Sequence, residues 1–243
     1  MGKSIHLVRS LHQVYSYRIP PAMPPSDASE AVVICTRNRP AELEETLDSI
    51  AAPPSINLLL AVMDASDAAP QARIQSVVED FDVLPSVHWS YTGTPSLARQ
   101  RNAALDRLPP SVEIVHFIDD DVTVHAGYFE TLSAALRSAS GAGGAGGVIV
   151  EPSKAAPTPS AERLRRLFFL SHPEAGHVLS SGCATDAQNP RLNETSSLRE
   201  TEWLSGCSSS YRRSLLDQHR FDEALTGYSM LEDLDLSYRI HRQ

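Results

Sequence analysis

Short apolar segments alternate with amphipathic helical segments, and this alternation restricts the possible folds more than any other feature of the chain. The apolar segments predict strands at Ala31–Cys35, Asn57–Met63, Val87–Tyr91, Val112–Ile118 and Val148–Val150. Helices are expected after the first four of them, from Pro40 and over residues 72–80, 96–107 and 127–138. This order predicts a mostly parallel central sheet with helices on both faces, which is a three-layer α/β sandwich of Rossmann-like type.

The length and composition fit a single domain. The 243 residues, 42% of them hydrophobic, show no change in composition that would divide the chain. Residues 1–30 are expected to be a peripheral N-terminal extension, because the pairs Pro20-Pro21 and Pro24-Pro25 stiffen the segment before the first strand. Residues 31–243 are then expected to form the domain.

Charge, cysteine content and hydropathy exclude several classes of protein. The net charge of -9 argues against nucleic-acid binding, which needs clustered Lys and Arg. The three cysteines are widely spaced and form no C-x-x-C pair, so a reducing compartment is expected. No apolar stretch approaches the roughly 20 residues that span a bilayer, and residues 1–17 lack the apolar core of a signal peptide. We expect a cytoplasmic protein, with peripheral contact at the inner face of a membrane left open.

Three acidic residues, Asp119, Asp120 and Asp121, directly follow the expected strand Val112–Ile118. Adjacent carboxylates repel, and in a poorly solvated cleft they stay ionised only if a cation compensates them. Because side chains alternate along a strand, Asp119 and Asp121 are expected to face one way and Asp120 the other. The pair predicts a site for Mn2+ or Mg2+, which prefer carboxylate and phosphate oxygens. A solvated acidic turn is the alternative interpretation.

Polar residues also follow two other expected strands. The sequence Thr36-Arg-Asn-Arg follows the first strand, and Asp64 follows the second. Each has a simpler interpretation, as a helix cap, a turn residue or a solvated charge. In open α/β sheets, however, ligands bind outside the carboxyl ends of the strands, so the three loops together predict a binding site at one edge of the sheet.

Five segments occur in an order that is typical of one family. They are Ala31-Val-Val-Ile-Cys-Thr-Arg-Asn-Arg-Pro, Leu97-Ala-Arg-Gln-Arg-Asn-Ala-Ala-Leu, Phe117-Ile-Asp-Asp-Asp-Val, Trp203-Leu-Ser-Gly-Cys-Ser-Ser-Ser-Tyr-Arg-Arg and Glu232-Asp-Leu-Asp-Leu-Ser-Tyr-Arg. Over residues 31–242 they resemble the family-2 glycosyltransferases of GT-A fold, which transfer sugars from nucleotide diphosphates. The third segment resembles the D-x-D metal element of that family. Any one segment alone would be a weak signal.

The resemblance implies a donor site in about residues 31–125. The residues implied to bind the nucleotide sugar are Thr36, Arg37, Asp64, Arg101, Asn102, Asp119 and Asp120. Asp64 would accept the N–H of the base, because charge-assisted hydrogen bonds are roughly twice as strong as neutral ones. Asp121 would be the principal ligand of the Mn2+ or Mg2+ ion, together with Asp119. The metal would stabilise the negative charge that grows on the departing diphosphate.

The resemblance also implies an acceptor site in about residues 126–243, for a saccharide or lipid-linked acceptor. Asp233 would act as the general base on the acceptor hydroxyl, with Glu232 in support, and a single displacement would invert the anomeric configuration. Trp203, Gly206 and Cys207 would contact the acceptor. The simpler interpretation of the acidic pair is that acidic side chains favour the first turn of a helix.

Two other functions remain open. The chain stops at Gln243, earlier than relatives usually do, so a non-catalytic sugar-nucleotide-binding or scaffold protein is one alternative. A metal-dependent nucleotidyltransferase is the other, although the segment Thr36–Pro40 contains no phosphate-binding glycine. A role in polysaccharide biosynthesis follows only from the analogy with the family.

Two further features are not assigned to the site. The glycine run Gly141–Gly146 has the letters of a dinucleotide-binding motif but comes after a helix and before a strand, so it is interpreted as a flexible connection. His116 is interpreted as a core or surface histidine, because its position in the strand directs it away from Asp119.

Overall fold

The computed structural model describes residue 23 and residues 26–149, 159–168, 170, 172, 176–185, 198–225 and 230–243. Its strands are β1 (Glu30–Thr36), β2 (Leu58–Asp64), β3 (Ser86–Tyr91), β4 (Ile114–Asp119), β5 (Gly144–Ala145) and β6 (Ser208–Arg212). Its helices are α1 (Pro40–Asp48), α2 (Ala68–Glu79), α3 (Leu97–Arg107), α4 (Tyr128–Ser138), α5 (Pro159–Leu167), α6 (Arg213–Gln218) and α7 (Glu232–His241). The predicted alternation of strands and helices over residues 31–138 is confirmed.

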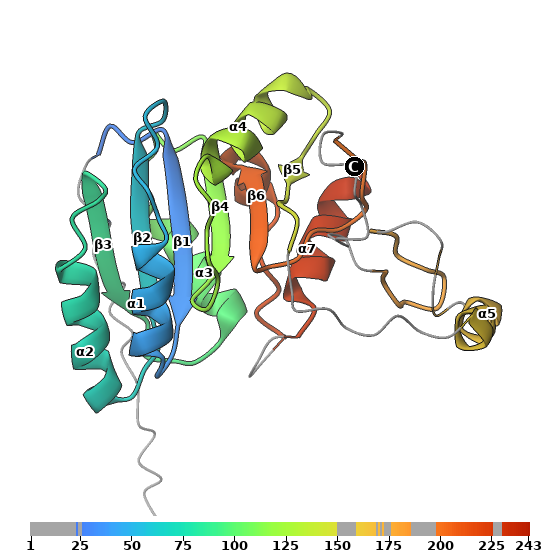
Figure 1. The fold of residues 1–243 in the computed structure, drawn as a ribbon, viewed down its shortest axis with the longest axis horizontal. Helices are drawn as coiled ribbons and strands as arrows, with labels where there is room; N and C mark the ends of the chain where they lie inside the picture. Colours follow the sequence, from blue (N-terminus) through green and yellow to red (C-terminus); the bar gives the residue numbers. More distant parts are fainter. Residues whose placement is uncertain are drawn as a thin grey trace, which may run out of the picture.

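The strands form one six-stranded sheet in the order β3-β2-β1-β4-β6-β5 (Figure 1). The first four are parallel to one another, whereas β6 runs antiparallel to both β4 and β5. Thr36 pairs with Asp64 in register, and Cys35 pairs with Asp119. The carboxyl ends of β1, β2 and β4 therefore lie at one edge of the sheet, as predicted.

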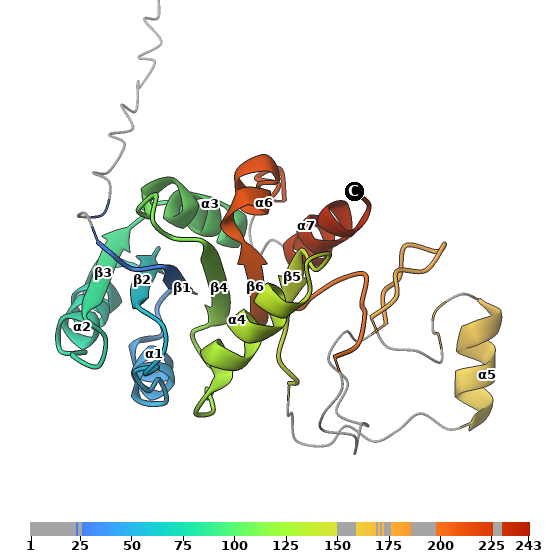
Figure 2. The same ribbon diagram turned by 90° about the horizontal axis from the view of Figure 1, so that it is seen from above.

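Helices cover both faces of the sheet, which confirms the three-layer α/β class. Helices α1, α2 and α4 lie on one face, and α3, α6 and α7 lie on the other (Figure 2). Alternate strand residues supply the two cores: Ile34 and Ile118 pack with the first set of helices, and Val33 and Phe117 pack with the second. This alternation continues to the ends of β1 and β4, so it also decides on which face each polar residue of the site lies.

The domain begins before residue 31. Met23 and Ala28 are buried in the core that α3, α6 and α7 cover, and the backbone N–H of Met23 donates to the carbonyl of Arg107. The expected peripheral extension over residues 1–30 therefore packs against the domain from Met23 where it is described, while residues 1–22 lie outside the described part.

Two residues of the glycine run, Gly144 and Ala145, form strand β5, which corrects the interpretation of the run as a flexible connection. Gly144 pairs with Tyr211 of β6, and a Cβ atom at Gly144 would lie 2.8 Å from Leu204 and 2.9 Å from Tyr211. Both contacts would be with side chains, so glycine at this position leaves room for the side chains of Leu204 and Tyr211 to pack against the strand. The strand expected at Val148–Val150 was wrong for its described residues, because Val148 is exposed and neither Val148 nor Ile149 pairs; Val150 lies outside the described part.

His116 is a core residue, as predicted. Its side chain is fully buried, with Nδ1 2.7 Å from Ser210 Oγ and Nε2 2.9 Å from Glu30 Oε2. Glu30 also accepts hydrogen bonds from Ser133 and Arg137 of α4. This cluster lies at the start of β1, at the opposite end of the strand from Thr36, and does not take part in the site.

No helix in the described ranges is long and apolar enough to cross a membrane.

Candidate functional site

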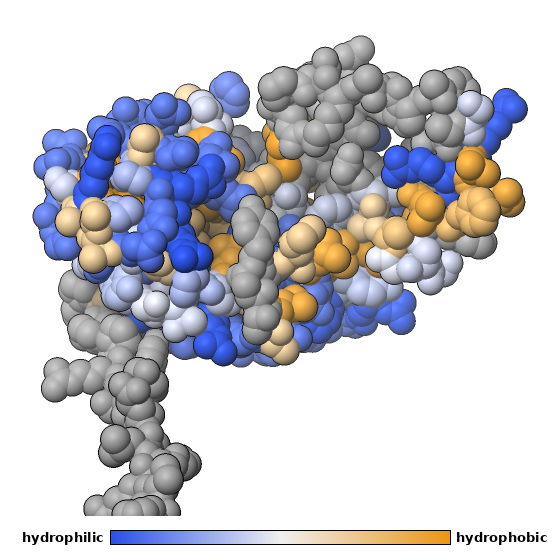
Figure 3. Space-filling model, turned by 90° about the horizontal axis from the view of Figure 1, so that it is seen from below, coloured by the Kyte–Doolittle hydropathy of each residue, from blue (hydrophilic) through white to orange (hydrophobic). Residues whose placement is uncertain are grey.

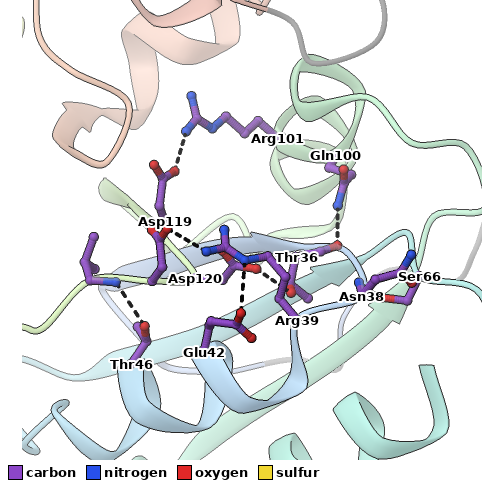
Figure 4. A network of polar contacts seen from close by, with 12 residues as sticks. Thr36, Asn38, Arg39, Glu42, Thr46, Ser66, Gln100, Arg101, Asp119 and Asp120 are labelled. Atoms are coloured by element: carbon purple, nitrogen blue, oxygen red, sulfur yellow. Dashed lines mark hydrogen bonds and ion pairs between the residues drawn. The ribbon is translucent and has the colours of Figure 1, made fainter. Parts of the chain in front are cut away.

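The polar residues at the carboxyl ends of β1 and β4 separate into two clusters, one on each face of the sheet. Thr36 and Asp120 lie on the α1 face, and Asp119 points to the α3 face, where Arg101 lies (Figure 4). The alternation of side chains explains this separation, because Asp119 and Asp120 are consecutive. The expected opposite directions of these two carboxylates are therefore confirmed.

The cluster on the α1 face is held by Arg39. This residue directly precedes α1, and its guanidinium donates to Asp120 Oδ1 at 2.9 Å and to Asp121 Oδ2 at 2.7 Å. Thr36 Oγ1 donates to Asp120 Oδ2 at 2.6 Å. Burial raises the pKa of Asp120 to about 6, although Thr36 and Arg39 act to lower it. Asp120 is buried, whereas Asp121 is exposed.

Asp121 does not continue the strand alternation. Strand β4 ends at Asp119, and the following turn places Asp121 beside the same guanidinium that Asp120 contacts. The expectation that Asp121 faces the same way as Asp119 was therefore wrong, because the point at which a strand ends is not fixed by its apolar pattern.

The cluster on the α3 face is organised by Arg101. This side chain is 2% exposed and donates from Nη1 to Glu232 Oε1 at 2.8 Å and from Nη2 to the carbonyl of Gly206 at 3.0 Å. A longer bond of 3.4 Å joins Nη2 to Asp119 Oδ1. Its guanidinium lies over the rings of Phe117 and Phe221, at 5.5 and 5.2 Å from their centroids. Arg101 thus joins the end of β4 to the start of α7.

The two acidic partners of Arg101 are poorly solvated. Burial raises the pKa of Glu232 to about 7, against the lowering effect of Arg101. Burial also raises the pKa of Asp119, and the negative charges of Asp121 and Asp233 raise it further. Asp119 and Glu232 both contact the guanidinium of Arg101, which lies between the end of β4 and the start of α7.

Asp233 is held in place by backbone donors. Its Oδ2 accepts from the N–H of Gly206 at 2.7 Å, and its Oδ1 accepts from its neighbour Leu234 at 2.8 Å. Both bonds orient the carboxylate at the first turn of α7. Asp235 instead pairs with Arg239 one turn along the helix, so it points elsewhere, as expected.

Gly206 allows the loop before β6 to approach Arg101. A Cβ atom at this position would lie 2.8 Å from both Nη1 and Nη2 of Arg101. Its N–H and carbonyl contact Asp233 and Arg101 respectively, so this one residue connects the candidate base to the buried arginine. Cys207 follows it, and burial raises the pKa of the Cys207 thiol. Trp203 donates from its indole N–H to the carbonyl of Thr185 at 2.8 Å.

Three residues expected in the donor site have other contacts here. Asp64 is fully buried, and its carboxylate accepts from the N–H of Ser66 at 2.8 Å and from the indole of Trp89 at 3.3 Å. Asn102 bonds to the backbone of Phe221 and to Glu223, so it holds that loop. Arg37 is exposed beside the end of β1. Their roles toward a nucleotide stay predictions.

Two site residues were not selected from the sequence. Arg39 belongs to a loop predicted at the binding site, but the sequence indicates no individual role for it or for Gln100. Gln100 donates to the carbonyls of Thr36 and Met63 and so joins the ends of β1 and β2. Pro40 is the first residue of α1, and proline is favoured at this position. The sequence therefore indicates that Arg39 lies directly before the helix. The spacing does not reveal its partners, because Asp120 is 81 positions away.

The donor atoms are of the kind that a hard divalent cation binds. Mg2+ and Mn2+ are usually held by one or two carboxylates, with the remaining oxygens supplied by substrate phosphates. Asp119 and Asp121 offer two such groups at the exposed edge of the sheet. Within the described ranges, no three His, Cys, Asp or Glu side chains are grouped to hold a metal by themselves. The carboxylates fit a metal shared with a diphosphate and do not form an all-protein cage.

A mostly parallel sheet with an antiparallel β6, and acidic residues at the end of β4 and the start of α7, define a protein of GT-A fold. The chain belongs to the glycosyltransferase-like family 2, whose family model matches residues 28–243. The resemblance found in the sequence is thereby confirmed. No curated protein sequence matches the chain.

Solved structures share the fold at low sequence identity. The chain is similar to S. aureus TarS 1–349, with a TM-score of 0.55 and 19% identity over 88% of this chain and 55% of that one. For TarS 1–349 in complex with UDP-GlcNAc the TM-score is 0.52 and the identity is 17%, over 86% of this chain and 53% of that one. The chain is also similar to Mycobacterium tuberculosis glucosyl-3-phosphoglycerate synthase in complex with phosphoglyceric acid. The TM-score is 0.52 and the identity is 18%, over 88% of this chain and 67% of that one. The chain therefore spans about half the length of the TarS 1–349 chain.

Proposed function

We propose that this domain transfers a sugar from a nucleotide-diphosphate donor to an acceptor hydroxyl, with inversion at the anomeric carbon. The observation that carries the proposal is the set of contacts that joins Asp119 at the end of β4 to Asp233 at the start of α7. Arg101 contacts Asp119 at 3.4 Å and the carbonyl of Gly206 at 3.0 Å, and the N–H of Gly206 donates to Asp233 at 2.7 Å. A sugar bound beside Asp119 would have the candidate metal ligands on one side and a carboxylate on the other. Membership in the family supports the same activity.

On the donor side, the carboxyl ends of β1 and β4 would receive the nucleotide diphosphate. Asp119 and Asp121 would hold a Mn2+ or Mg2+ ion together with the diphosphate oxygens, and the ion would supply Lewis-acid stabilisation of the leaving group. In this structure Arg39 forms an ion pair with Asp121. This ion pair would break when the donor binds, so that Asp121 could bind the metal. Thr36 and Asp120 would form the floor of the site, since both are buried and bonded to each other.

On the acceptor side, Asp233 would take the proton of the attacking hydroxyl. The N–H groups of Gly206 and Leu234 fix the orientation of the Asp233 carboxylate. Its remaining lone pairs could therefore accept the proton without a change in the Asp233 side-chain conformation. Glu232 is buried against Arg101 and would position the first turn of α7 without touching the acceptor itself. A single displacement from the face opposite the diphosphate would invert the anomeric configuration.

Calorimetric titration with a panel of nucleotide sugars, with and without Mn2+, tests the donor assignment. UDP-GlcNAc belongs in the panel because it is bound in one of the TarS structures. Asp121→Asn should weaken the Mn2+-dependent part of donor binding. Asp233→Asn should lower turnover by about 100-fold or more while leaving the donor Kd unchanged, since loss of a general base costs roughly that much.

Asp235→Asn is the matched control, because Asp235 lies on the same turn of α7 but pairs with Arg239. Full turnover by Asp233→Asn would reject the base assignment. Donor binding by the wild-type chain, with neither hydrolysis nor transfer to any acceptor offered, would instead support the alternative of a non-catalytic sugar-nucleotide-binding protein.

A further inference from the structure

Several exposed hydrophobic residues of the described chain lie together in one short segment, which is helix α5 and the residues directly after it. Leu164, Leu167 and Phe168 are 57%, 72% and 60% exposed, and the nearby Leu170 is 42% exposed. Both ribbon views place α5 away from the sheet and its covering helices (Figures 1 and 2). The helix therefore presents an apolar surface that the body of the domain does not cover.

The apolar residues of α5 form one stripe. Leu164, Leu167 and Phe168 are spaced at i, i+3 and i+4, and the N–H of Phe168 donates to the carbonyl of Leu164, so the helical geometry reaches Phe168. In a globular protein the apolar stripe of a helix normally faces the core. The stripe of α5 is exposed instead, so packing within the domain does not explain it.

Arginines border this stripe. Arg163, Arg165 and Arg166 are all exposed, and at 3.6 residues per turn Arg163 and Arg165 lie on either side of the apolar face. Figure 3 shows hydrophobic and hydrophilic residues side by side at the end of the molecule where α5 lies. With three arginines and one glutamate, the nine residues of α5 carry a net charge of +2, in contrast to the net charge of -9 of the whole chain.

We propose that α5 docks in the plane of an anionic lipid bilayer. The stripe of Leu164, Leu167 and Phe168 would enter the boundary between headgroups and acyl chains, while Arg163 and Arg165 would remain at the level of the phosphates. A short helix with an apolar face and basic borders is suited to lie in the interface and is too short to span the membrane. Electrostatic attraction to anionic headgroups would act on this segment although the protein as a whole is acidic.

Charge favours a bilayer over a second copy of the chain as the occupant. In a symmetric dimer built on this stripe, the same patch faces itself, so the arginines that border one stripe would approach those that border the other. An anionic bilayer offers opposite charge on both sides of the stripe. The proposal does not depend on the transferase assignment, because none of these residues belongs to the candidate site.

Flotation of the whole chain with vesicles tests the proposal. The wild-type chain should bind phosphatidylcholine vesicles that contain phosphatidylglycerol, bind vesicles of phosphatidylcholine alone more weakly, and lose affinity at high salt as the charges are screened. Leu167→Ser/Phe168→Ser should lower the partition coefficient by about tenfold or more. Arg163→Gln/Arg165→Gln should lower binding only where phosphatidylglycerol is present.

Matched controls lie in the other half of the domain. Val83→Ser removes another exposed hydrophobic residue, and Arg73→Gln removes an exposed arginine of α2, so neither should change vesicle binding. Asp233→Asn should also bind vesicles normally, which separates this proposal from the catalytic one. Circular dichroism should show that all variants are folded, since every changed side chain on α5 is exposed.

Two results would overturn the proposal. One is equal binding of the wild-type chain and Leu167→Ser/Phe168→Ser to vesicles with phosphatidylglycerol, including no binding by either. The other is a wild-type dimer, seen by light scattering, that the same double substitution converts to a monomer without any vesicle binding by either protein. That outcome would identify a second copy of the chain as the occupant of the stripe.

Discussion

Arg101 Nη1 donates a 2.8 Å hydrogen bond to Glu232 Oε1, and the two residues are 131 positions apart in the chain. Both side chains are buried, at 2% and 6% exposure. The bond holds the first turn of α7, and with it Asp233, against α3 and the end of β4. This buried pair therefore acts together with the backbone donors of Asp233 to fix the position of Asp233 relative to the end of β4.

Replacement of Arg101 by Met should strongly destabilise the fold. The apolar stem is kept, but Glu232 loses its partner and the carbonyl of Gly206 loses a donor. Breaking one side of a buried ion pair costs about 3–5 kcal/mol of unfolding free energy. Urea denaturation measures this loss. Arg99→Met on the same helix is the control and should cost less than about 1 kcal/mol, because Arg99 is half-exposed and pairs weakly with Glu223.

The double variant Arg101→Met/Glu232→Leu should recover part of that stability. Removing both charges leaves no unpaired carboxylate in the core, and apolar replacement of a buried ion pair is often close to neutral. The loss should be smaller than the sum of the two single losses, by about 1–3 kcal/mol. Strict additivity in a double-mutant cycle would show that the pair contributes nothing beyond its individual contacts.

Gly206→Ala should disturb the site through a single methyl group. The new Cβ would lie 2.8 Å from both Nη atoms of Arg101, so either the loop or the guanidinium must shift. Such overpacking costs about 1–3 kcal/mol, and activity should fall further because Gly206 also orients Asp233. Gly141→Ala is the control, since no atom lies within 4 Å of its added Cβ. Thermal melts and turnover of both variants give the comparison.

The fold could be predicted from the sequence because apolar periodicity is a local signal. The strands β1 to β4 and their helices were expected, and the resulting sheet edge brought Thr36, Asp64 and Asp119 together. The antiparallel pairing of β5 with β6 could not be predicted in this way. It depends on the close contact of Gly144 with Tyr211, which are far apart in sequence.

The details of the site were harder to predict because they depend on long-range partners. The sequence indicated Arg101 and Glu232 as site residues, but not that they form a buried pair. The loop that contains Arg39 was predicted at the site, but the partners of Arg39 were not, because only the pairing of β4 with β1 places Asp120 and Asp121 beside it. The local sequence pattern predicts strands and helices through their hydrophobic periodicity, but it does not predict which distant side chains will pair.

Arg39→Gln should strengthen the binding of Mn2+. The guanidinium now neutralises Asp120 and Asp121, so a cation must compete with it for Asp121. Without this competition the Mn2+ affinity should rise by up to about fivefold, because a screened ion pair of this exposure is worth up to about 1 kcal/mol. Calorimetric titration of Mn2+ measures the change. Arg37→Gln is the control, since Arg37 is exposed in the same loop, and an equal gain in both variants would contradict the specific role of Arg39.

The stability of the protein should fall as the pH rises from about 4.5 to about 7, and Glu232 should be the main cause. Burial raises the pKa of Glu232 from 4.5 to about 7. In this range the unfolded chain has already lost the proton that the folded protein still holds, so raising the pH favours unfolding until Glu232 ionises in both states. The loss should be on the order of 2–3 kcal/mol.

Glu232→Gln separates this contribution from others. Glutamine keeps an oxygen that can accept the hydrogen bond of Arg101 but has no proton to lose, so the decline between pH 5 and 7 should become shallower. Glu79→Gln, an exposed change on α2, should leave the decline unaltered. Urea denaturation at several pH values gives the unfolding free energies. If the decline persists unchanged in Glu232→Gln and ends near pH 6, Asp120 is its source, because burial raises the pKa of that carboxyl to about 6.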